Sequence, residues 1–196
     1  VARTTHTQGP NQTWCVDVFR TLHTPQTYQI QAFVNPTVTN GTPTGPVTLT
    51  IDQVNAVKGL AAAGNAALDT PGANTGLFAG YGDNIVSAAV QAAIWEVINP
   101  AGAFVGANGN ATSRGQVNAL FGTLTSDASL AQFRLQGQSV TAAWLTAVNP
   151  QNGRGQGQIW VTPGGGGGFE VPVPTPAALL VFALGLVGLA AARRVA

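Results

Sequence analysis

The chain has 196 residues, enough for one ordinary domain with appendages. Only 8% of its residues are charged and the formal net charge is +1, so the sequence lacks the basic patch that a nucleic-acid-binding protein needs. A single cysteine, Cys15, excludes a disulfide within the chain. The two histidines, His6 and His23, do not stand at metal-ligand spacing, and no metal or other cofactor is expected.

Residues 13–22 predict the first β-strand, because they are rich in β-branched and aromatic side chains. Alternation puts Cys15 and Asp17 on one face of this strand and Trp14 on the other. Residues 26–34 also alternate, and they predict a second strand that forms a hairpin with the first.

The segments that follow predict mainly loops and helices. We expect a loop at 35–46, a short strand at 47–50, a helix at 51–63, a loop at 66–81, a helix from 83 or 84 to just before 100, a loop at 101–111, helices at 112–124 and 126–135, and a strand at 158–162. Thr50 and Gln53 form a capping box at the start of the first helix, and Gly64 is its expected C-cap. Residues 139–148 fit either a helix or a strand.

Strands followed by helices predict an α+β domain over residues 1–162, with a small β-sheet or sandwich part beside a helical part. After it the composition changes abruptly. Residues 163–176 are rich in glycine and proline, and they predict a linker of flexible and extended chain.

Residues 177–192 are all apolar or glycine, and two arginines follow directly. As a helix these residues would span roughly 24 Å, at the short end for a hydrocarbon core of about 30 Å. We therefore expect a single C-terminal transmembrane helix at 177–192, with 193–196 as a basic cytoplasmic end and the domain outside. A buried terminal helix of the domain is the alternative.

This tail resembles a PEP-CTERM sorting signal, which joins a proline motif, a hydrophobic helix rich in Ala, Leu and Gly, and a basic end. The motif here reads Val171-Pro172-Val173-Pro174, with Val173 in the place of the usual glutamate. The resemblance covers residues 171–194. It implies an exported protein of a Gram-negative bacterium, held in the inner membrane with its domain in the periplasm or at the cell surface. The tail is then either cut by an exosortase near the proline motif or kept as a membrane anchor. The absence of methionine from the chain agrees with removal of a signal peptide.

One amide, Gln91, stands in the middle of a stretch, residues 88–97, that is apolar almost throughout. An unpaired buried amide costs about 1–3 kcal/mol. The amide is therefore expected either to bond a neighbouring loop or to react with Cys15. Helix geometry puts Ala88, Ile94 and Trp95 next to it.

Two short motifs resemble the paired motifs of bacterial thioester domains, which are surface domains with an internal Cys–Gln thioester. Trp14-Cys15-Val16 matches the first motif, an aromatic residue, cysteine and an apolar residue on an early strand. Gln91-Ala92-Ala93-Ile94-Trp95 matches the second, although Val90 stands where the commoner form has threonine. The resemblance implies a thioester between Cys15 and Gln91.

Such a bond forms when the cysteine sulfur attacks the side-chain carbonyl of the glutamine and ammonia leaves. The thiolate is the nucleophile, and the fold must bring the two groups together and exclude water. The expected walls of the dry pocket are Trp14, Ala88, Ile94 and Trp95. Asp17 either orients a proton transfer or is a solvated strand carboxylate. Without a thioester, Cys15 is a small buried hydrophobe.

Three classes of function follow from these patterns. The first is a membrane-anchored extracytoplasmic thioester domain that attaches to an amine of a protein or surface outside the cell, or cross-links itself. Such a protein is not an enzyme, because it modifies itself once at most. The second is a structural or interaction subunit of an envelope or membrane assembly, without covalent chemistry. The third, a hydrolase, lacks a Gly-x-Ser-x-Gly motif and an evident acid–base pair.

Overall fold

The computed structural model of the chain describes residues 5–6, 9–10, 13–17, 28–34, 36–42, 45–69, 74–100, 110–147 and 156–161. Its strands are β1 (Thr5–His6), β2 (Gly9–Pro10), β3 (Thr13–Cys15), β4 (Tyr28–Ala32), β5 (Thr37–Thr42), β6 (Gly45–Thr48), β7 (Ala142–Ala147) and β8 (Gln158–Val161). Its helices are α1 (Ile51–Asp69), the short 3-10 helix η1 (Gly76–Phe78), α2 (Asp83–Ile98), α3 (Ala111–Leu124) and α4 (Asp127–Gln138). The predicted α+β class is confirmed for this part of the chain.

The largest sheet has four antiparallel strands in the order β3-β8-β7-β4, and the pairs β1–β2 and β5–β6 form two small ribbons. The predicted hairpin of the first two long strands is wrong. β3 pairs with β8 and β4 pairs with β7, so β3 and β4 lie at opposite edges of the sheet. Alternation identifies the faces of a strand, but it does not identify the partner strand.

One further expectation is wrong, and one ambiguous segment is resolved by the structure. The loop predicted at 35–46 is largely a β-hairpin, in which Thr37 pairs with Thr48 and Val38 with Val47. Threonine and valine favour extended backbone, and here they outweigh the neighbouring prolines and glycines. The ambiguous segment 139–148 contains the strand β7.

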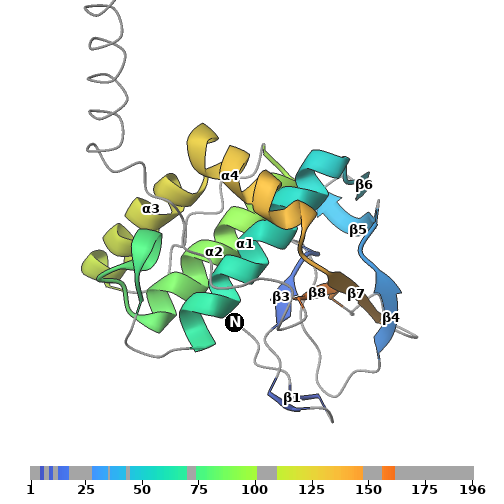
Figure 1. Ribbon diagram of the computed structural model, residues 1–196, viewed down its shortest axis with the longest axis horizontal. Helices are drawn as coiled ribbons and strands as arrows, with labels where there is room; N and C mark the ends of the chain where they lie inside the picture. Colours follow the sequence, from blue (N-terminus) through green and yellow to red (C-terminus); the bar gives the residue numbers. More distant parts are fainter. Residues whose placement is uncertain are drawn as a thin grey trace, which may run out of the picture.

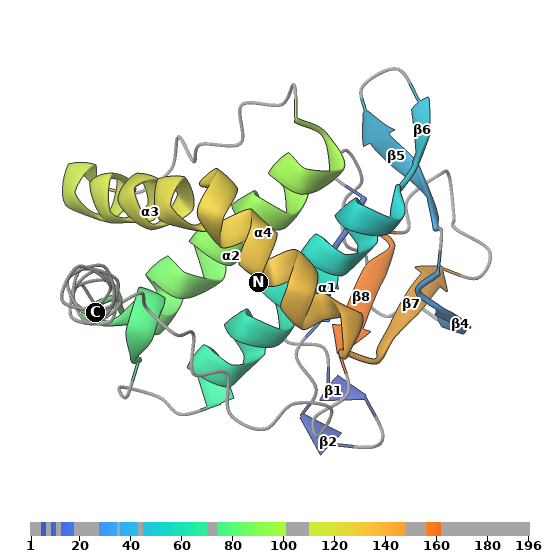
Figure 2. The ribbon, with the colours of Figure 1, turned by 45° about the horizontal axis from the view of Figure 1, so that its top comes forward.

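The four α-helices lie together on one side of the four-stranded sheet, and α1 is the helix that packs against it (Figure 1). Figure 2 shows α1 running beside β8, with α2 and α4 on its other sides. The predicted capping box is confirmed at its N-terminus: the Thr50 N–H donates to Gln53 Oε1 (2.9 Å), and the Gln53 N–H donates to Thr50 Oγ1 (3.3 Å). The predicted helices at 112–124 and 126–135 correspond to α3 and α4.

The predicted end of α1 at Gly64 is wrong, because the helix continues to Asp69. A Cβ atom at Gly64 would lie 2.6 Å from the ring of Trp14 and 2.9 Å from Val90. Glycine at this position therefore makes room for the indole, whose Nε1 donates to Asn65 Oδ1 in the next residue of the helix (2.8 Å).

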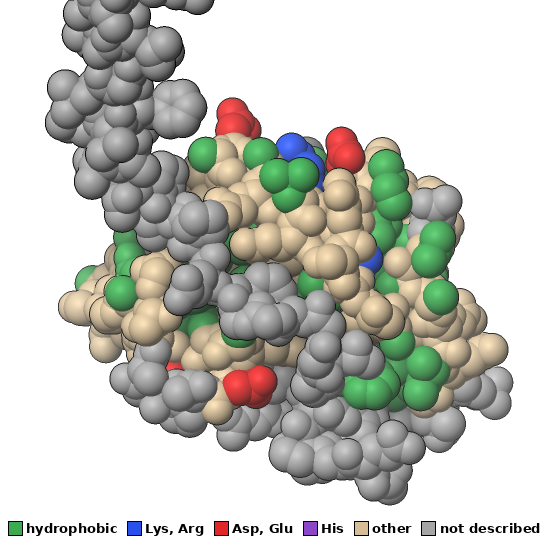
Figure 3. Space-filling view, in the orientation of Figure 1, with side chains coloured by type: hydrophobic (Ala, Val, Ile, Leu, Met, Phe, Trp, Pro, Cys, Tyr) green, Lys and Arg blue, Asp and Glu red, His purple; other side chains and the backbone are tan. Residues whose placement is uncertain are grey.

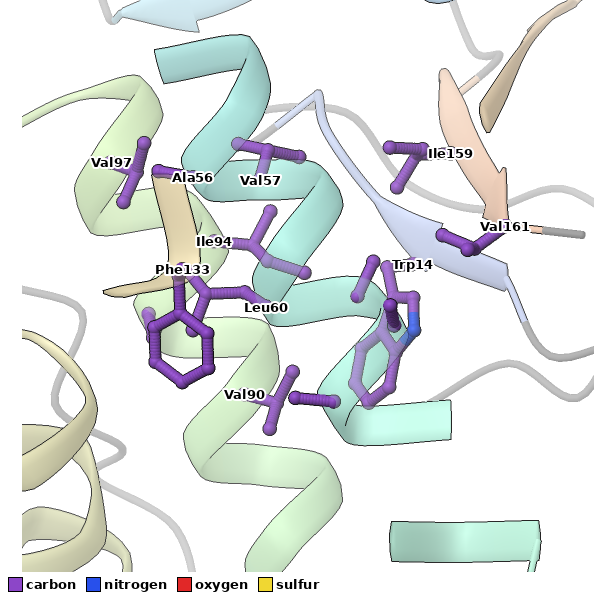
Figure 4. Packing of buried hydrophobic residues seen from close by; sticks show 14 of the residues in the cluster. Trp14, Ala56, Val57, Leu60, Val90, Ile94, Val97, Phe133, Ile159 and Val161 are labelled. Atoms are coloured by element: carbon purple, nitrogen blue, oxygen red, sulfur yellow. The ribbon is translucent and has the colours of Figure 1, made fainter. Parts of the chain in front are cut away.

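The hydrophobic core lies between α1, α2, α4 and the inner face of the sheet. Figure 4 shows Trp14 from β3 and Ile159 from β8 on one side of α1, and Ile94 from α2 on another. The helices α1 and α4 cross closely at two glycines. A Cβ atom at Gly59 would overlap the backbone carbonyl of Phe133, and one at Gly137 would overlap that of Asn55.

Figure 3 shows a face of the molecule with only a few charged side chains, as the composition predicts. The predicted linker at 163–176, the transmembrane helix at 177–192 and the basic end at 193–196 lie outside the described residues. Among the helices that the structure does describe, none is both long and apolar enough to cross a membrane.

Candidate functional site

The side chain of Gln91, in α2, lies directly against the backbone of Cys15, the last residue of β3. The Cys15 N–H donates to Gln91 Oε1 (3.0 Å), and Gln91 Nε2 donates to the Cys15 carbonyl oxygen (2.8 Å). These two bonds join residues 76 positions apart in the sequence. The buried amide, only 8% exposed, thus has a partner for each of its polar atoms.

The strand register explains why the backbone of Cys15 is open to the helix. Trp14 lies opposite Ile159, and the Val16 N–H donates to the Gly157 carbonyl (2.9 Å) on the β8 side. Alternate residues of an edge strand direct their backbone groups to opposite sides. The N–H and C=O of Cys15 therefore point to the outer edge of the sheet, where the Gln91 amide takes the place of a neighbouring strand.

The four predicted wall residues have different positions. Ile94 is fully buried between α2 and α1, and Trp14 is buried on the α1 side of the sheet, where its ring lies against Gly64 (Figure 4). Trp95 is half-buried. The prediction that Ala88 walls the pocket is wrong, because Ala88 lies on the exposed side of α2, while the neighbouring Val86, Ala89 and Val90 are buried.

Asp17 is 3% exposed, so the alternative of a solvated strand carboxylate is wrong. Its Oδ2 accepts a hydrogen bond from the Gly157 N–H (2.7 Å), and its carbonyl oxygen accepts one from Gln156 Nε2 (2.8 Å). The carboxylate thus holds the chain that leads into β8 beside the end of β3.

The surroundings of Cys15 disfavour its thiolate. Burial is the largest cause that raises the pKa of the Cys15 thiol, to about 11, and the negative charge of Asp17 adds a small further increase. At neutral pH only roughly one thiol in 10⁴ would then be ionised. The structure carries Cys15 as a free thiol, partly exposed. A site with these properties favours uncharged forms of sulfur, which are the thiol and its acyl derivative.

A second set of polar side chains lies on the same face of the sheet as Cys15. Gln158 is directly opposite Cys15 in the β3–β8 pair and is fully buried. Its Oε1 accepts a hydrogen bond from the Thr13 hydroxyl, and its Nε2 donates to the Tyr28 hydroxyl oxygen (3.0 Å). Because β7 separates β4 from β8, the Tyr28 ring must reach across β7 to make this contact.

Charge on Cys15 would also act on Tyr28. Burial raises the pKa of the Tyr28 phenol, and the nearby Cys15 thiolate would raise it further, while the hydrogen bond from Gln158 opposes the shift. The sequence analysis missed Thr13, Tyr28 and Gln158 as site residues because they come from three different strands. The one local signal was a glutamine at the start of an otherwise apolar strand.

No family model, curated protein or solved structure matches this chain. Its site is therefore interpreted from geometry. Within the described ranges, no group of three or more His, Cys, Asp or Glu side chains is placed to hold a metal ion. The group that stands out chemically is the Cys15–Gln91 pair.

Proposed function

We propose that this protein is a membrane-anchored extracytoplasmic domain in which Cys15 and Gln91 form an internal thioester. The bond serves for covalent attachment to an amine on another protein or surface, or as an internal cross-link. The observation that carries the proposal is the pair of reciprocal hydrogen bonds between the Gln91 amide and the Cys15 backbone. They keep the amide carbon beside the one residue that carries a thiol.

The same hydrogen bonds suit the reaction. As sulfur attacks the amide carbon, negative charge develops on Oε1, and the Cys15 N–H already donates to that atom. A preorganised backbone donor of this kind stabilises a tetrahedral intermediate. The C–N bond then breaks, and Nε2 leaves as ammonia with the proton from the thiol. Holding the two groups together supplies the proximity that a poorly reactive amide needs.

The environment of the sulfur also suits a long-lived bond. Burial and Asp17 make the Cys15 thiolate unfavourable, so the thiolate is a poor leaving group. Water attack on the acyl group is then slow. A bond that persists until an amine arrives fits a protein that reacts once.

The anchor rests on the sequence of the tail. Residues 177–192 are continuously apolar and are followed by Arg193 and Arg194, which favours an orientation with the domain outside the cytoplasm. The glycine-rich segment before them separates the domain from the bilayer.

A second candidate is a structural or interaction subunit of an envelope or membrane assembly that uses this fold without covalent chemistry. It is favoured by the same contact, because two hydrogen bonds already satisfy the Gln91 amide as a structural side chain. In that case Gln91 only closes the edge of the sheet at β3.

Intact-protein mass spectrometry of the full chain separates the two candidates. We expect the wild-type chain to be lighter than its sequence by one ammonia, and methylamine to add to Gln91 under native conditions. Variants Cys15→Ala and Gln91→Glu, as controls, should show their sequence masses and take up no methylamine. A wild-type chain at its full sequence mass, with Cys15 open to alkylation, would reject the thioester and leave the structural candidate.

A further inference from the structure

Opening of the proposed thioester by an amine requires a proton for the departing sulfur. The buried surroundings of Cys15 disfavour a free thiolate, so a donor at this point would determine how fast the bond opens. The described carboxylate nearby, Asp17, accepts a hydrogen bond from Gly157 and repels negative charge on the sulfur. A different group has to supply the proton.

The hydroxyl of Tyr28 lies on the side of the sheet where this step takes place, near enough for charge on Cys15 to act on it. It lies over the face of the sheet that carries Cys15, because Gln158, its hydrogen-bond partner, is the residue directly opposite Cys15. Side chains opposite each other in an antiparallel pair have Cβ atoms about 5 Å apart.

The hydrogen bonds of Gln158 leave the Tyr28 proton free of that residue. The Thr13 hydroxyl donates to Oε1 of Gln158, so Nε2 of Gln158 faces Tyr28 and donates to its oxygen. The Tyr28 oxygen is thus an acceptor in this contact, and its hydrogen is directed elsewhere. Within the part of the chain that the structure describes, this hydrogen has no acceptor.

We propose that Tyr28 is the residue that transfers a proton to the Cys15 sulfur when an amine opens the thioester, and that Gln158 and Thr13 are positioning residues for it. This inference rests on the proposed function. The amine nitrogen bonds to the Gln91 side-chain carbon as the carbon–sulfur bond breaks. Tyr28 gives its hydroxyl proton to the sulfur and recovers one from the attacking amine through solvent, so the products are a substituted amide and a thiol.

The test follows the opening of the thioester in the full chain by hydroxylamine, which remains unprotonated from neutral to alkaline pH. The rate is read by mass spectrometry as formation of the hydroxamate at Gln91. We expect Tyr28→Phe to slow the opening by about 10²-fold, the lower end of what a positioned proton donor contributes. The matched control is Tyr81→Phe at the other tyrosine of the chain, which should react as the wild type does.

The pH profile separates proton transfer from a packing effect. The wild-type rate should fall as pH rises through the pKa of Tyr28, which burial raises above its ordinary value, because the phenol then loses the proton that it donates. Tyr28→Phe should lack this fall. Gln158→Leu, which removes the positioning contact, should slow the opening by a smaller factor and keep the fall.

The outcomes are distinct for the two proposals. If Tyr28→Phe opens at the wild-type rate with the wild-type pH profile, the role of Tyr28 is rejected and the thioester stands. If Tyr28→Phe unfolds at the wild-type temperature but never loses ammonia, the role of Tyr28 is supported, because formation moves a proton at the same sulfur. If the wild-type chain itself shows no loss of ammonia, both proposals are rejected together.

Discussion

The side chain of Gln91, in helix α2, makes the hydrogen bonds that a neighbouring strand would make at the edge of the sheet. Its amide reproduces the donor and acceptor of one peptide group, and it pairs with the N–H and C=O of Cys15 as a neighbouring strand would. Loss of this amide would leave both backbone groups of Cys15 without their partners. Each such group costs about 1–3 kcal/mol when it is buried and unpaired, and less where water reaches it.

Single and double substitutions at this pair separate its two roles through stability. If the thioester forms, Cys15→Ala opens a closed loop of about 77 residues and should cost about 4 kcal/mol, by analogy with a disulfide. Gln91→Ala should cost more, because Cys15→Ala keeps an intact amide with its two hydrogen bonds and Gln91→Ala loses them. The double variant should cost no more than Gln91→Ala alone. Urea unfolding measures all three.

The structural candidate gives a different pattern in that experiment. Cys15→Ala would then remove only a small, partly exposed side chain and keep the backbone bonds to Gln91. A cost below about 1 kcal/mol for Cys15→Ala, beside a clear loss for Gln91→Ala, would show that hydrogen bonds alone stabilise the edge.

Residue patterns predicted the pair itself but not its geometry. An amide in an apolar helix needs a partner, and the only cysteine was the natural candidate. That the partner atoms are the backbone of Cys15, and that Gln158 lies opposite it, follows from the β3–β8 register, which joins residues from the two ends of the domain. The exposure of Ala88 was not predictable either, because helix spacing gives the neighbours of a residue along α2 but not which side of the helix other elements cover.

At the scale of the elements, helices were easier to predict than strands. The signals of a helix are local, such as the Thr50–Gln53 capping box, and they are confirmed in α1. The pairing of a strand depends on distant segments, and the expected hairpin of the first two long strands is replaced by the pairs β3–β8 and β4–β7. Gly64 shows the limit of a local signal, since tertiary contact with Trp14 gives it a different role from the expected C-cap.

The crossing of α1 and α4 depends on glycine at the point of contact. Gly59→Ala should destabilise the domain by about 1–3 kcal/mol or more, because its Cβ overlaps the Phe133 backbone, which cannot move aside as a side chain could. The control is Gly115→Ala in α3, where nothing lies within 4 Å of the added atom. That change should stabilise the helix by about 0.5–1 kcal/mol.

Thermal unfolding of both glycine variants measures these effects. Equal changes in midpoint for Gly59→Ala and Gly115→Ala would contradict the close crossing of α1 and α4. A lower midpoint for the first and a higher one for the second is the expected result.

The whole molecule combines an α+β domain with a tail of contrasting composition. The glycine-rich segment 163–176 favours a domain that folds without the apolar segment 177–192. A chain ending at residue 162 should therefore remain in the soluble fraction and unfold at the same temperature as the full chain. The full chain should sediment with membranes and resist extraction by high salt. A fall in the unfolding temperature on truncation would instead support a terminal helix buried in the domain.

The two edges of the four-stranded sheet differ, and this limits how copies of the protein can polymerise through β-pairing. At β3, the Gln91 side chain already occupies the backbone groups of Cys15. At β4, no described strand pairs with the outer edge, and the uncharged segment 28–34 exposes Ile30 by 64% and Val34 by 68%. Growth of a filament requires two open edges per subunit. Pairing of this sheet through β4 alone would stop at two copies, so the intact Gln91 amide prevents strand addition at β3 by occupying both backbone groups of Cys15.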